Sequence, residues 1–424
     1  MTAPNLSAAT AAEVLAGHLA TPPTPSADRP WLAQSLHQGA AGMALVHIER
    51  AHHGSGSWQT AHAWVTATTH DGVSAADDTG LHFGAPAVAY VLQAAQADGT
   101  ARYGSALAAL DRHVSALVHR RVDAAFARID RGELPDFAEY DLLHGLTGIG
   151  AHLLQREAGG EGLGRVLRYL VTLARPLRVD GTALPGWWVG HDPQRRDGSP
   201  EFAGGHANLG IAHGVTGPLA LLAQALRRGM EVDGHREAIE TICAWLDAWR
   251  QDADTGPWWP QWITRDELHT GRPRQRGPLR PSWCYGTPGI ARAHQLAAIA
   301  THDVARQEMA ESAVARCLSD PAQLDRITDG GLCHGWAGVH QTAWRAAQDA
   351  RTPEIRGCLP RLADHLLSYA QTEAYERAGH VGRGTRTADP RGLLEGAVGL
   401  ALALQTAAHD ASPITSWDAC LLIN

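Results

Sequence analysis

Two cysteines and one histidine occupy matching places in two short motifs. The motifs are Trp-Cys-Tyr-Gly at 283–286 and Leu-Cys-His-Gly at 332–335, and their glycines are 49 residues apart. Cys284 and Cys333 each stand two residues before the glycine, and His334 stands directly before it. Zinc prefers thiolate and imidazole ligands, and a catalytic zinc keeps one coordination position for substrate. The sequence therefore predicts a catalytic zinc site formed by Cys284, Cys333 and His334.

A Gly-x-x-Gly step follows both motifs and recurs along the chain. The seven copies begin at Gly39, Gly84, Gly145, Gly214, Gly286, Gly335 and Gly396, at intervals of 45, 61, 69, 72, 49 and 61 residues. The second copy is degenerate, because Ala87 replaces its second glycine. Self-similarity of this kind indicates one supersecondary unit per copy.

The segments around these glycines have helical patterns of two kinds. Apolar Ala/Leu-rich runs follow the glycine pairs, for example at 43–48, 218–226 and 400–404, and are typical of buried helices. Amphipathic segments lie between the motifs, at 107–129, 163–177, 236–250, 307–318 and 355–372. The alternation predicts an all-α fold, an α/α toroid of seven helical hairpins with buried helices inside and amphipathic helices outside.

The residues directly before each first glycine form an unusually polar set. They are Gln38, Phe83, His144, His213, Tyr285, His334 and Glu395. If every inner helix begins at its glycine pair, these side chains gather at one mouth of the ring. The positive ends of the helix dipoles lie there and favour anions such as thiolates.

Composition and length set further bounds. The chain has 424 residues, 44% of them hydrophobic, and the repeats run from Gly39 to Gly399, so we expect a single toroid domain over 1–424. The net charge of −8 gives no indication of binding to nucleic acid or an anionic membrane. The sequence shows no apolar stretch of about 18 residues that could span a bilayer, and no signal peptide. Six scattered cysteines favour a reducing, cytoplasmic location.

Two segments do not have helical patterns. Residues 179–208 are rich in turn residues around a strand-like core, which predicts a small β-containing insertion between repeats three and four. Residues 256–281 are similar and include the basic run Arg-Pro-Arg-Gln-Arg at 272–276, which is typical of a solvated loop.

Taken together, the motifs resemble those of the lanthionine synthetase C-like family, best known as lanthipeptide cyclases. The resemblance covers nearly the whole chain, and the Trp-Cys-Tyr-Gly and Cys-His-Gly pair is its specific signature. The other matching segments are Tyr-Asp-Leu-Leu-His-Gly at 140–145, Asn-Leu-Gly-Ile-Ala-His-Gly at 208–214, Arg-Pro-Ser at 280–282, Leu-Leu-Glu-Gly at 393–396 and Trp-Asp-Ala-Cys-Leu-Leu at 417–422. The degenerate second repeat departs from the pattern, away from the expected ligands.

The resemblance implies an enzyme of lanthipeptide antibiotic biosynthesis with one Zn²⁺ per chain. Such a cyclase adds peptide cysteine thiolates to dehydroalanine or dehydrobutyrine, a Michael-type addition that forms (methyl)lanthionine thioether rings. The repeats consume the chain, so we expect a separate dehydratase to supply the dehydrated precursor peptide, which has a leader and a core. An export transporter is a further expected partner, and nucleic acid and stable membrane insertion are not expected.

Roles for single residues follow from this implied reaction. Two thiolates and one imidazole leave zinc formally neutral, so a bound substrate thiolate stays electron-rich. His213 is the candidate acid that protonates the enolate, and Asp141 either orients His213 or accepts the thiol proton. Arg280 is expected to hold the enolate oxygen or peptide carbonyl, and Tyr285 to hydrogen-bond a ligand or the intermediate.

Two alternatives stay open at the level of sequence. One is another thiol-alkylating reaction within the same family, such as addition of glutathione to dehydrated residues. The other is a zinc-containing scaffold without catalysis in a peptide-modification complex. A protein prenyltransferase β-subunit, also an α/α ring with zinc, uses an Asp-Cys-His ligand set, and the second cysteine here argues against it.

Overall fold

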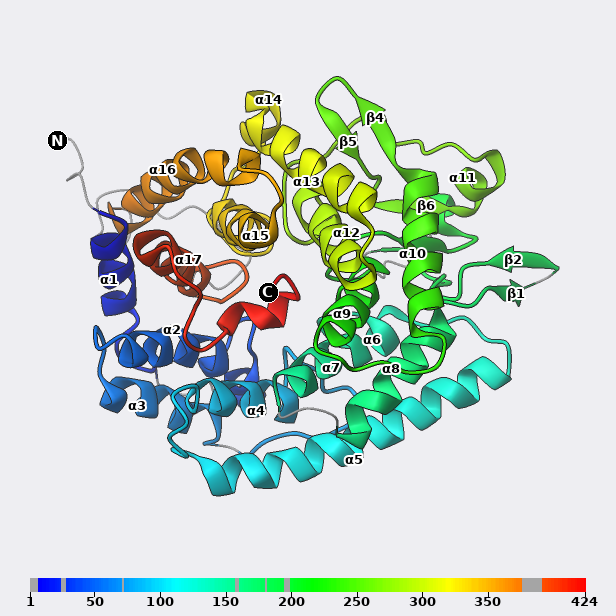
Figure 1. Cartoon of the computed structure of the whole chain (residues 1–424). Coiled ribbons are helices and arrows are strands. Elements are labelled where there is room, and N and C mark those ends of the chain that lie inside the picture. The colour runs from blue at the N-terminus through cyan, green and yellow to red at the C-terminus, as the bar shows by residue number, and fades with distance from the viewer. Residues whose placement is uncertain are drawn as a thin grey trace. The chain divides into compact units, whose positions relative to one another are not determined.

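The described chain divides into two compact units. The structure, a computed structural model, describes residues 7–23, 28–70, 72–156, 160–179, 181–193, 199–375 and 391–424. One unit comprises Met1–Val114, Ile327–Asp418 and Asn424, and the other comprises Ser115–Arg326 and Ala419–Ile423. Seven helices of the described chain begin at or just after a copy of the glycine step (Figure 1).

Four of these helices belong to the first unit and are buried on nearly every face. They are α2 (Ala40–His52), α4 (Ala85–Ala94), α15 (Trp336–Asp349) and α17 (Ala397–His409), and the first glycine of each copy is the N-cap. α2 packs against α4 and α17, and α15 packs against α17. The helix starts expected from the glycine pattern are therefore confirmed in this unit.

Each of three buried helices in this unit packs on a half-exposed partner. The partners are α3 (Trp58–Thr68) on α2, α16 (Glu354–Tyr375) on α15, and α1 (Ala8–His18) on α17. The short helix η1 (Pro30–Gln34) lies before α2, and α5 (Gly104–Asp130) follows α4 along the chain. The last buried helix is thus covered by the first helix of the chain (Figure 1).

The second unit repeats the arrangement with three buried helices, α7 (Leu146–Gln155), α9 (Thr216–Arg227) and α12 (Thr287–Thr301). α9 packs between α7 and α12. Their partners are α8 (Glu161–Leu173), α10 (His235–Trp249) and α13 (Val304–Ser319). The short helices of this unit are α6 (Phe137–Tyr140), η2 (Pro200–Phe202), α11 (Arg265–Thr270) and α14 (Pro321–Leu324). The short helix η4 (Trp417–Leu421) begins in the first unit and ends in the second.

The amphipathic segments expected between the motifs are helices, with one difference. The segment expected at 163–177 ends as helix α8 at Leu173, and Leu177 already belongs to strand β1. Pro176 explains the early end, because proline lacks an N–H and disfavours helical backbone at the residue before it.

Six short strands form three two-stranded ladders in the described chain. β1 (Leu177–Val179) pairs with β2 (Thr182–Leu184), and β4 (Gln251–Ala253) pairs with β5 (Gly256–Trp258). β3 (His206–Asn208) pairs with β6 (Trp262–Thr264). This pairing connects the two segments in which no helix was expected, 179–208 and 256–281. Residues 180 and 194–198 of the expected insertion lie outside the described residues. β3 ends at Asn208, where the turn that carries His213 begins, so the ladder fixes one end of that turn.

The glycine turns share a backbone hydrogen bond. The N–H of the second glycine donates to the carbonyl seven residues earlier in four copies, Gly42 to Ser35 (3.4 Å), Gly148 to Asp141 (3.3 Å), Gly289 to Ser282 (3.3 Å) and Gly338 to Gly331 (3.2 Å). A Cβ at Gly338 would lie 1.9 Å from the carbonyl oxygen of Leu332. Glycine is therefore required by close backbone approach. The degenerate copy departs in backbone as well, since Gly84 has φ +81°.

Neighbouring turns within each unit are tied together by backbone hydrogen bonds. In the first unit, Leu36 N donates to His82 O (3.0 Å) and Cys333 N donates to Leu394 O (2.8 Å). In the second unit, Leu142 N donates to Ala212 O (3.1 Å), and Ile211 N donates to Cys284 O (2.9 Å). The backbones that carry Asp141, His213 and Cys284 are thus held in fixed register.

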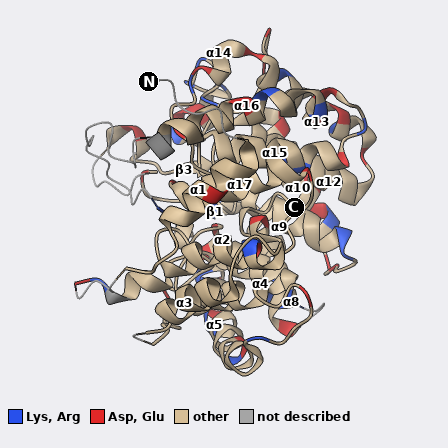
Figure 2. Cartoon of the chain, turned by 90° about the vertical axis from the view of Figure 1, so that its left-hand side faces the viewer, with Lys and Arg blue, Asp and Glu red and all other residues tan. Residues whose placement is uncertain are grey.

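Several of the buried helices lack charged residues, whereas most of the helices that pack on the outside of them carry charges. α4, α7 and α17 contain no Lys, Arg, Asp or Glu, whereas α8 and α13 carry both signs, which are drawn blue and red in Figure 2. In the described parts of the chain, no helix has both the length and the apolar character needed to cross a membrane.

Candidate active site

Asp141 and His213 form the best-defined polar pair of the second unit. Asp141 Oδ1 accepts backbone N–H groups from His144 (2.6 Å) and Gly145 (2.8 Å), which directs Oδ2 away from the backbone. Oδ2 lies 2.7 Å from Nδ1 of His213. Asp141 is fully buried, while 29% of the His213 side chain is exposed. A carboxylate on Nδ1 leaves Nε2 of His213 as the atom that can exchange a proton with a substrate.

Asp141 is held in its ionised form. Burial would raise the pKa of Asp141, but hydrogen bonds from His144 and His213 and the positive charge on their imidazoles outweigh burial. The pKa of Asp141 therefore lies well below its usual range. A carboxylate in this state accepts hydrogen bonds and is a poor acceptor for a proton near neutral pH, which suits it to orient His213.

Tyr285 lies next to His213 and has a defined hydrogen bond. The two ring centroids are 6.4 Å apart, and the Tyr285 hydroxyl oxygen accepts a hydrogen bond from Nδ2 of Asn208 (3.1 Å). Asn208 itself is fixed, since its Oδ1 accepts from Gly210 N (2.9 Å). In this hydrogen bond Asn208 is the donor and the Tyr285 hydroxyl oxygen is the acceptor.

Cys284 lies in the turn before α12 and is 6% exposed. Its carbonyl accepts the hydrogen bond from Ile211, and its Sγ lies 3.9 Å from Oγ of Ser282. The same Ser282 Oγ accepts from Tyr285 N (3.4 Å), so Ser282 caps the turn in the way that Asp141 caps its own. The N-terminus of α12 directly follows and favours a thiolate.

Cys333 and His334 lie in the equivalent turn before α15. Cys333 is half-buried, and its N–H is held by Leu394 O. Nε2 of His334 is 3.4 Å from Oδ2 of Asp329, whose Oδ1 accepts from Gly331 N (3.0 Å). Carboxylates commonly orient metal-binding histidines through the second ring nitrogen. Asp329 is therefore placed to orient His334.

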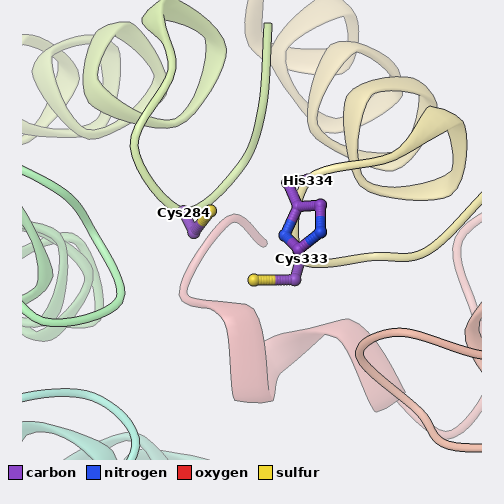
Figure 3. A group of neighbouring side chains, drawn as sticks. All are labelled: Cys284, Cys333 and His334. Atoms are coloured by element: carbon purple, nitrogen blue, oxygen red, sulfur yellow. The ribbon is translucent and has the colours of Figure 1, made fainter. Parts of the chain in front are cut away.

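The ligand atoms of Cys284, Cys333 and His334 all lie within 4.8 Å of one another. Figure 3 shows both sulfur atoms and the imidazole ring pointing into the same space. Around tetrahedral zinc, ligands at about 2.0–2.3 Å from the metal lie about 3.3–3.8 Å apart. The chemistry of the donor set therefore fits a zinc ion.

Arg280 begins the turn that carries Cys284. It is half-buried, and a Cβ on Gly286 would lie 2.9 Å from its backbone carbonyl oxygen. The backbone of Arg280 is therefore fixed against the start of α12, and its expected contact with an enolate oxygen stays a prediction.

Three further residues contact the candidate site residues and were not singled out from the sequence. Asn208 contacts Tyr285, Ser282 contacts Cys284 and Tyr285, and Asp329 contacts His334. Ser282 could have been found from the sequence, because it stands four residues before Gly286 just as Asp141 stands four residues before Gly145. Asn208 contacts a residue 77 positions away, so spacing alone gave no indication of it, whereas Asp329 lies in the same turn as His334.

A cysteine outside the group has a different environment. Burial raises the pKa of the Cys243 thiol to about 12, and its side chain packs in α10. Such a thiol is a small apolar core group and not a metal ligand.

The arrangement defines a helical repeat protein with a thiol- and imidazole-rich candidate metal centre. The chain belongs to the lanthionine synthetase C-like family, because the model of that family, "Lanthionine synthetase C-like protein", matches residues 30–422. It is also similar to "Nisin biosynthesis protein NisC" of Lactococcus lactis subsp. lactis, at 23% identity over 240 residues. That alignment covers 56% of this chain and 55% of the relative.

The solved structures include a similar fold over nearly the whole chain. The structure titled "Nisin cyclase" matches with a TM-score of 0.75 and 19% identity, covering 98% of this chain and 96% of that one. The likeness shows the fold, and the expected α/α toroid is thereby confirmed.

Proposed function

We propose that this protein is a zinc-dependent lanthipeptide cyclase. The group of Cys284, Cys333 and His334, with ligand atoms within 4.8 Å of one another, carries the proposal. Family membership and the similarity to a nisin biosynthesis protein support it. The reaction is addition of a peptide cysteine to dehydroalanine or dehydrobutyrine of the same peptide, which yields a thioether ring.

Zinc held by the three side chains would keep a substrate thiol deprotonated and so supply the nucleophile. Asp329 would hold His334 in the ring orientation that presents one nitrogen to the metal. The helix starts after Gly286 and Gly335 would stabilise the two protein thiolates.

The remaining chemistry falls to the protein side chains. The substrate sulfur forms a bond to Cβ, the Cα–Cβ π bond breaks, and its electron pair moves onto the peptide carbonyl as an enolate. Nε2 of His213 delivers a proton to Cα, while Asp141 holds Nδ1 and stabilises the charged imidazole. The proton count balances, because the thiol loses one proton and Cα gains one.

Two further side chains would act on the substrate. The guanidinium of Arg280 and the hydroxyl of Tyr285 are the donors proposed to hold the developing oxyanion. Asn208 would keep the Tyr285 hydroxyl turned so that its hydrogen points away from Asn208. The substrate would be a precursor peptide already dehydrated by a separate protein, and we propose that the reaction takes place in the cytoplasm.

The first test measures zinc per chain and cyclisation in parallel. We expect wild-type protein and Cys358→Ala to retain one zinc after dialysis and to consume the free thiol of a dehydrated peptide. Cys333→Ala should retain little zinc and leave the thiol open to alkylation. Cys358 is a suitable control because it is a buried cysteine in α16 outside the group.

Cyclisation leaves the peptide mass unchanged, so loss of alkylatable thiol is the readout. Zinc-loaded wild-type protein that consumes no thiol from several dehydrated peptides would refute the cyclase and favour a scaffold. Consumption of glutathione in place of the peptide thiol would favour the intermolecular reaction.

A further inference from the structure

A second group of metal-ligating side chains is formed by Asp141, His144 and His213. One ligand atom from each lies within 4.8 Å of the others. The three side chains come from the turns before α7 and α9, which are tied by the hydrogen bond from Leu142 N to Ala212 O. The proposed reaction gives the His144 side chain no contact with substrate, and its ring lies 3.5 Å from Oδ2 of Asp141.

The spacing of the group suits a small divalent transition metal. Oδ2 of Asp141 lies 2.7 Å from Nδ1 of His213 and 3.5 Å from Nδ1 of His144. Nitrogen and oxygen ligands at about 2.0–2.1 Å from tetrahedral zinc lie about 3.3 Å apart. The two observed separations fall on either side of that value, so an ion could replace the proton between Asp141 and His213 with little movement.

The group is also oriented by backbone hydrogen bonds and open to solvent. Oδ1 of Asp141 is occupied by two backbone N–H groups, so Oδ2 is the oxygen that faces the two imidazole rings. The His144 side chain is 55% exposed and the His213 side chain 29% exposed. An ion can therefore reach the group from solvent, and the His144 ring has room to turn toward it.

We propose that Asp141, His144 and His213 form a second, weaker zinc site that inhibits the enzyme when zinc is in excess. One carboxylate and two imidazoles are a good ligand set for zinc, yet they provide one anionic ligand where the cysteine group provides two. Binding must also displace the proton on Nδ1 of His213, which weakens it further. The inhibitory part rests on the proposed function, because the bound ion would withdraw His213 from proton transfer.

The binding test starts from wild-type protein that already holds one zinc per chain. Equilibrium dialysis against rising zinc, followed by elemental analysis, should show one additional ion per chain. His144→Ala should bind this ion at least about tenfold more weakly, since a ligand is removed. His269→Ala is the matched control, because His269 is an exposed histidine at the end of α11 in the same unit, and it should bind as wild type does.

Co²⁺ as the probe separates the two sites. The cysteine group should give sulfur-to-cobalt charge-transfer absorption, and the Asp141 group should add only weak d–d bands. The d–d bands of the second ion should be missing in His144→Ala and present in His269→Ala. Absence of a second ion in wild type, or equal binding in His144→Ala, would overturn the proposal.

The inhibition test compares each variant with its own rate at one zinc per chain. Added zinc should slow thiol consumption by wild type and His269→Ala and leave the rate of His144→Ala nearly unchanged over the same range. Equal inhibition of all three proteins would refute the regulatory role. If no protein consumes thiol at any zinc level, the proposed function fails, while the binding measurements still decide whether the second site exists.

Discussion

The turns before α2 and α7 share a backbone hydrogen bond and differ in chemistry. In both, the residue four places before the first glycine accepts a hydrogen bond from the residue directly before that glycine. Oγ of Ser35 accepts from Gln38 N (3.2 Å), and Oδ1 of Asp141 accepts from His144 N (2.6 Å). The single side-chain oxygen of Ser35 accepts a hydrogen bond within the turn. The carboxylate of Asp141 has a second oxygen, Oδ2, which pairs with Nδ1 of His213.

This difference shows how a structural position acquires a chemical role. Ser282 is the third residue of this kind, since its Oγ accepts from Tyr285 N (3.4 Å). Replacing a capping serine by aspartate keeps the turn and adds one free anionic oxygen. A side-chain acceptor stands at this position in three of the seven copies, and glycine stands there in the other four. The proposed reaction is what requires that the acceptor before α7 be a carboxylate.

Asp141→Ser should have the largest effect on activity. The substitution gives the turn before α7 the cap found before α2, so the fold should persist, but His213 loses the partner of its Nδ1. We expect thiol consumption to fall by about 10²–10⁴-fold, the usual contribution of a positioned acid or base. Rates on a dehydrated peptide, with zinc content measured on the same sample, provide the test. A variant that keeps zinc and most of its rate would show that Asp141 is a cap only.

Gly338→Ala should have the largest effect on stability. The new Cβ would lie 1.9 Å from the carbonyl oxygen of Leu332, so the backbone must shift and the shared turn hydrogen bond is strained. We expect a loss of about 2–4 kcal/mol in the free energy of unfolding, measured by urea denaturation.

Gly357→Ala is the matched control for that loss. Among the described residues, a Cβ on Gly357 would meet no atom within 4 Å, and the residue lies in helix α16. We expect this variant to gain about 0.4–1 kcal/mol, because alanine has less freedom in the unfolded chain. Similar losses in both variants would mean that helix propensity, and not close approach, explains the glycine at 338.

The stabilising effect of Asp141 should depend on pH in one direction. Its pKa is lowered in the folded state, so its ionised form stabilises the fold above the unfolded pKa of about 3.9. That contribution is lost as pH falls below this value and through the folded pKa. The difference in unfolding free energy between wild type and Asp141→Ser should therefore shrink from pH 6 to pH 3. A difference that stays constant or grows with acid would contradict the ionised state.

Ser35→Ala should have the smallest effect. Losing the cap before α2 is expected to cost about 1 kcal/mol of unfolding free energy. Thiol consumption should not change, because the turn before α2 carries no proposed catalytic or metal-binding residue. A substantial loss of activity with retained zinc would show that the turns are coupled more widely than their hydrogen bonds indicate.

Much of this fold could be predicted from local sequence. Glycine at the copies is required by backbone approaches within seven residues, so the starts of the buried helices follow from short motifs. The register of Cys284 and Cys333 follows in the same way. The pairing of α1 with α17 and of β3 with β6 could not be predicted, because each joins segments far apart in the chain.

The candidate site also has features encoded locally and features set by long-range packing. The sequence by itself determined which side chains precede each buried helix, since the turn and its glycine are encoded by adjacent residues. The tertiary structure decided which of those side chains meet, placing Asp141 on His213 and Asn208 on Tyr285. The physical reason is range. A turn is stabilised by hydrogen bonds over a few residues, whereas the partners of a side chain depend on how whole helices and strands pack.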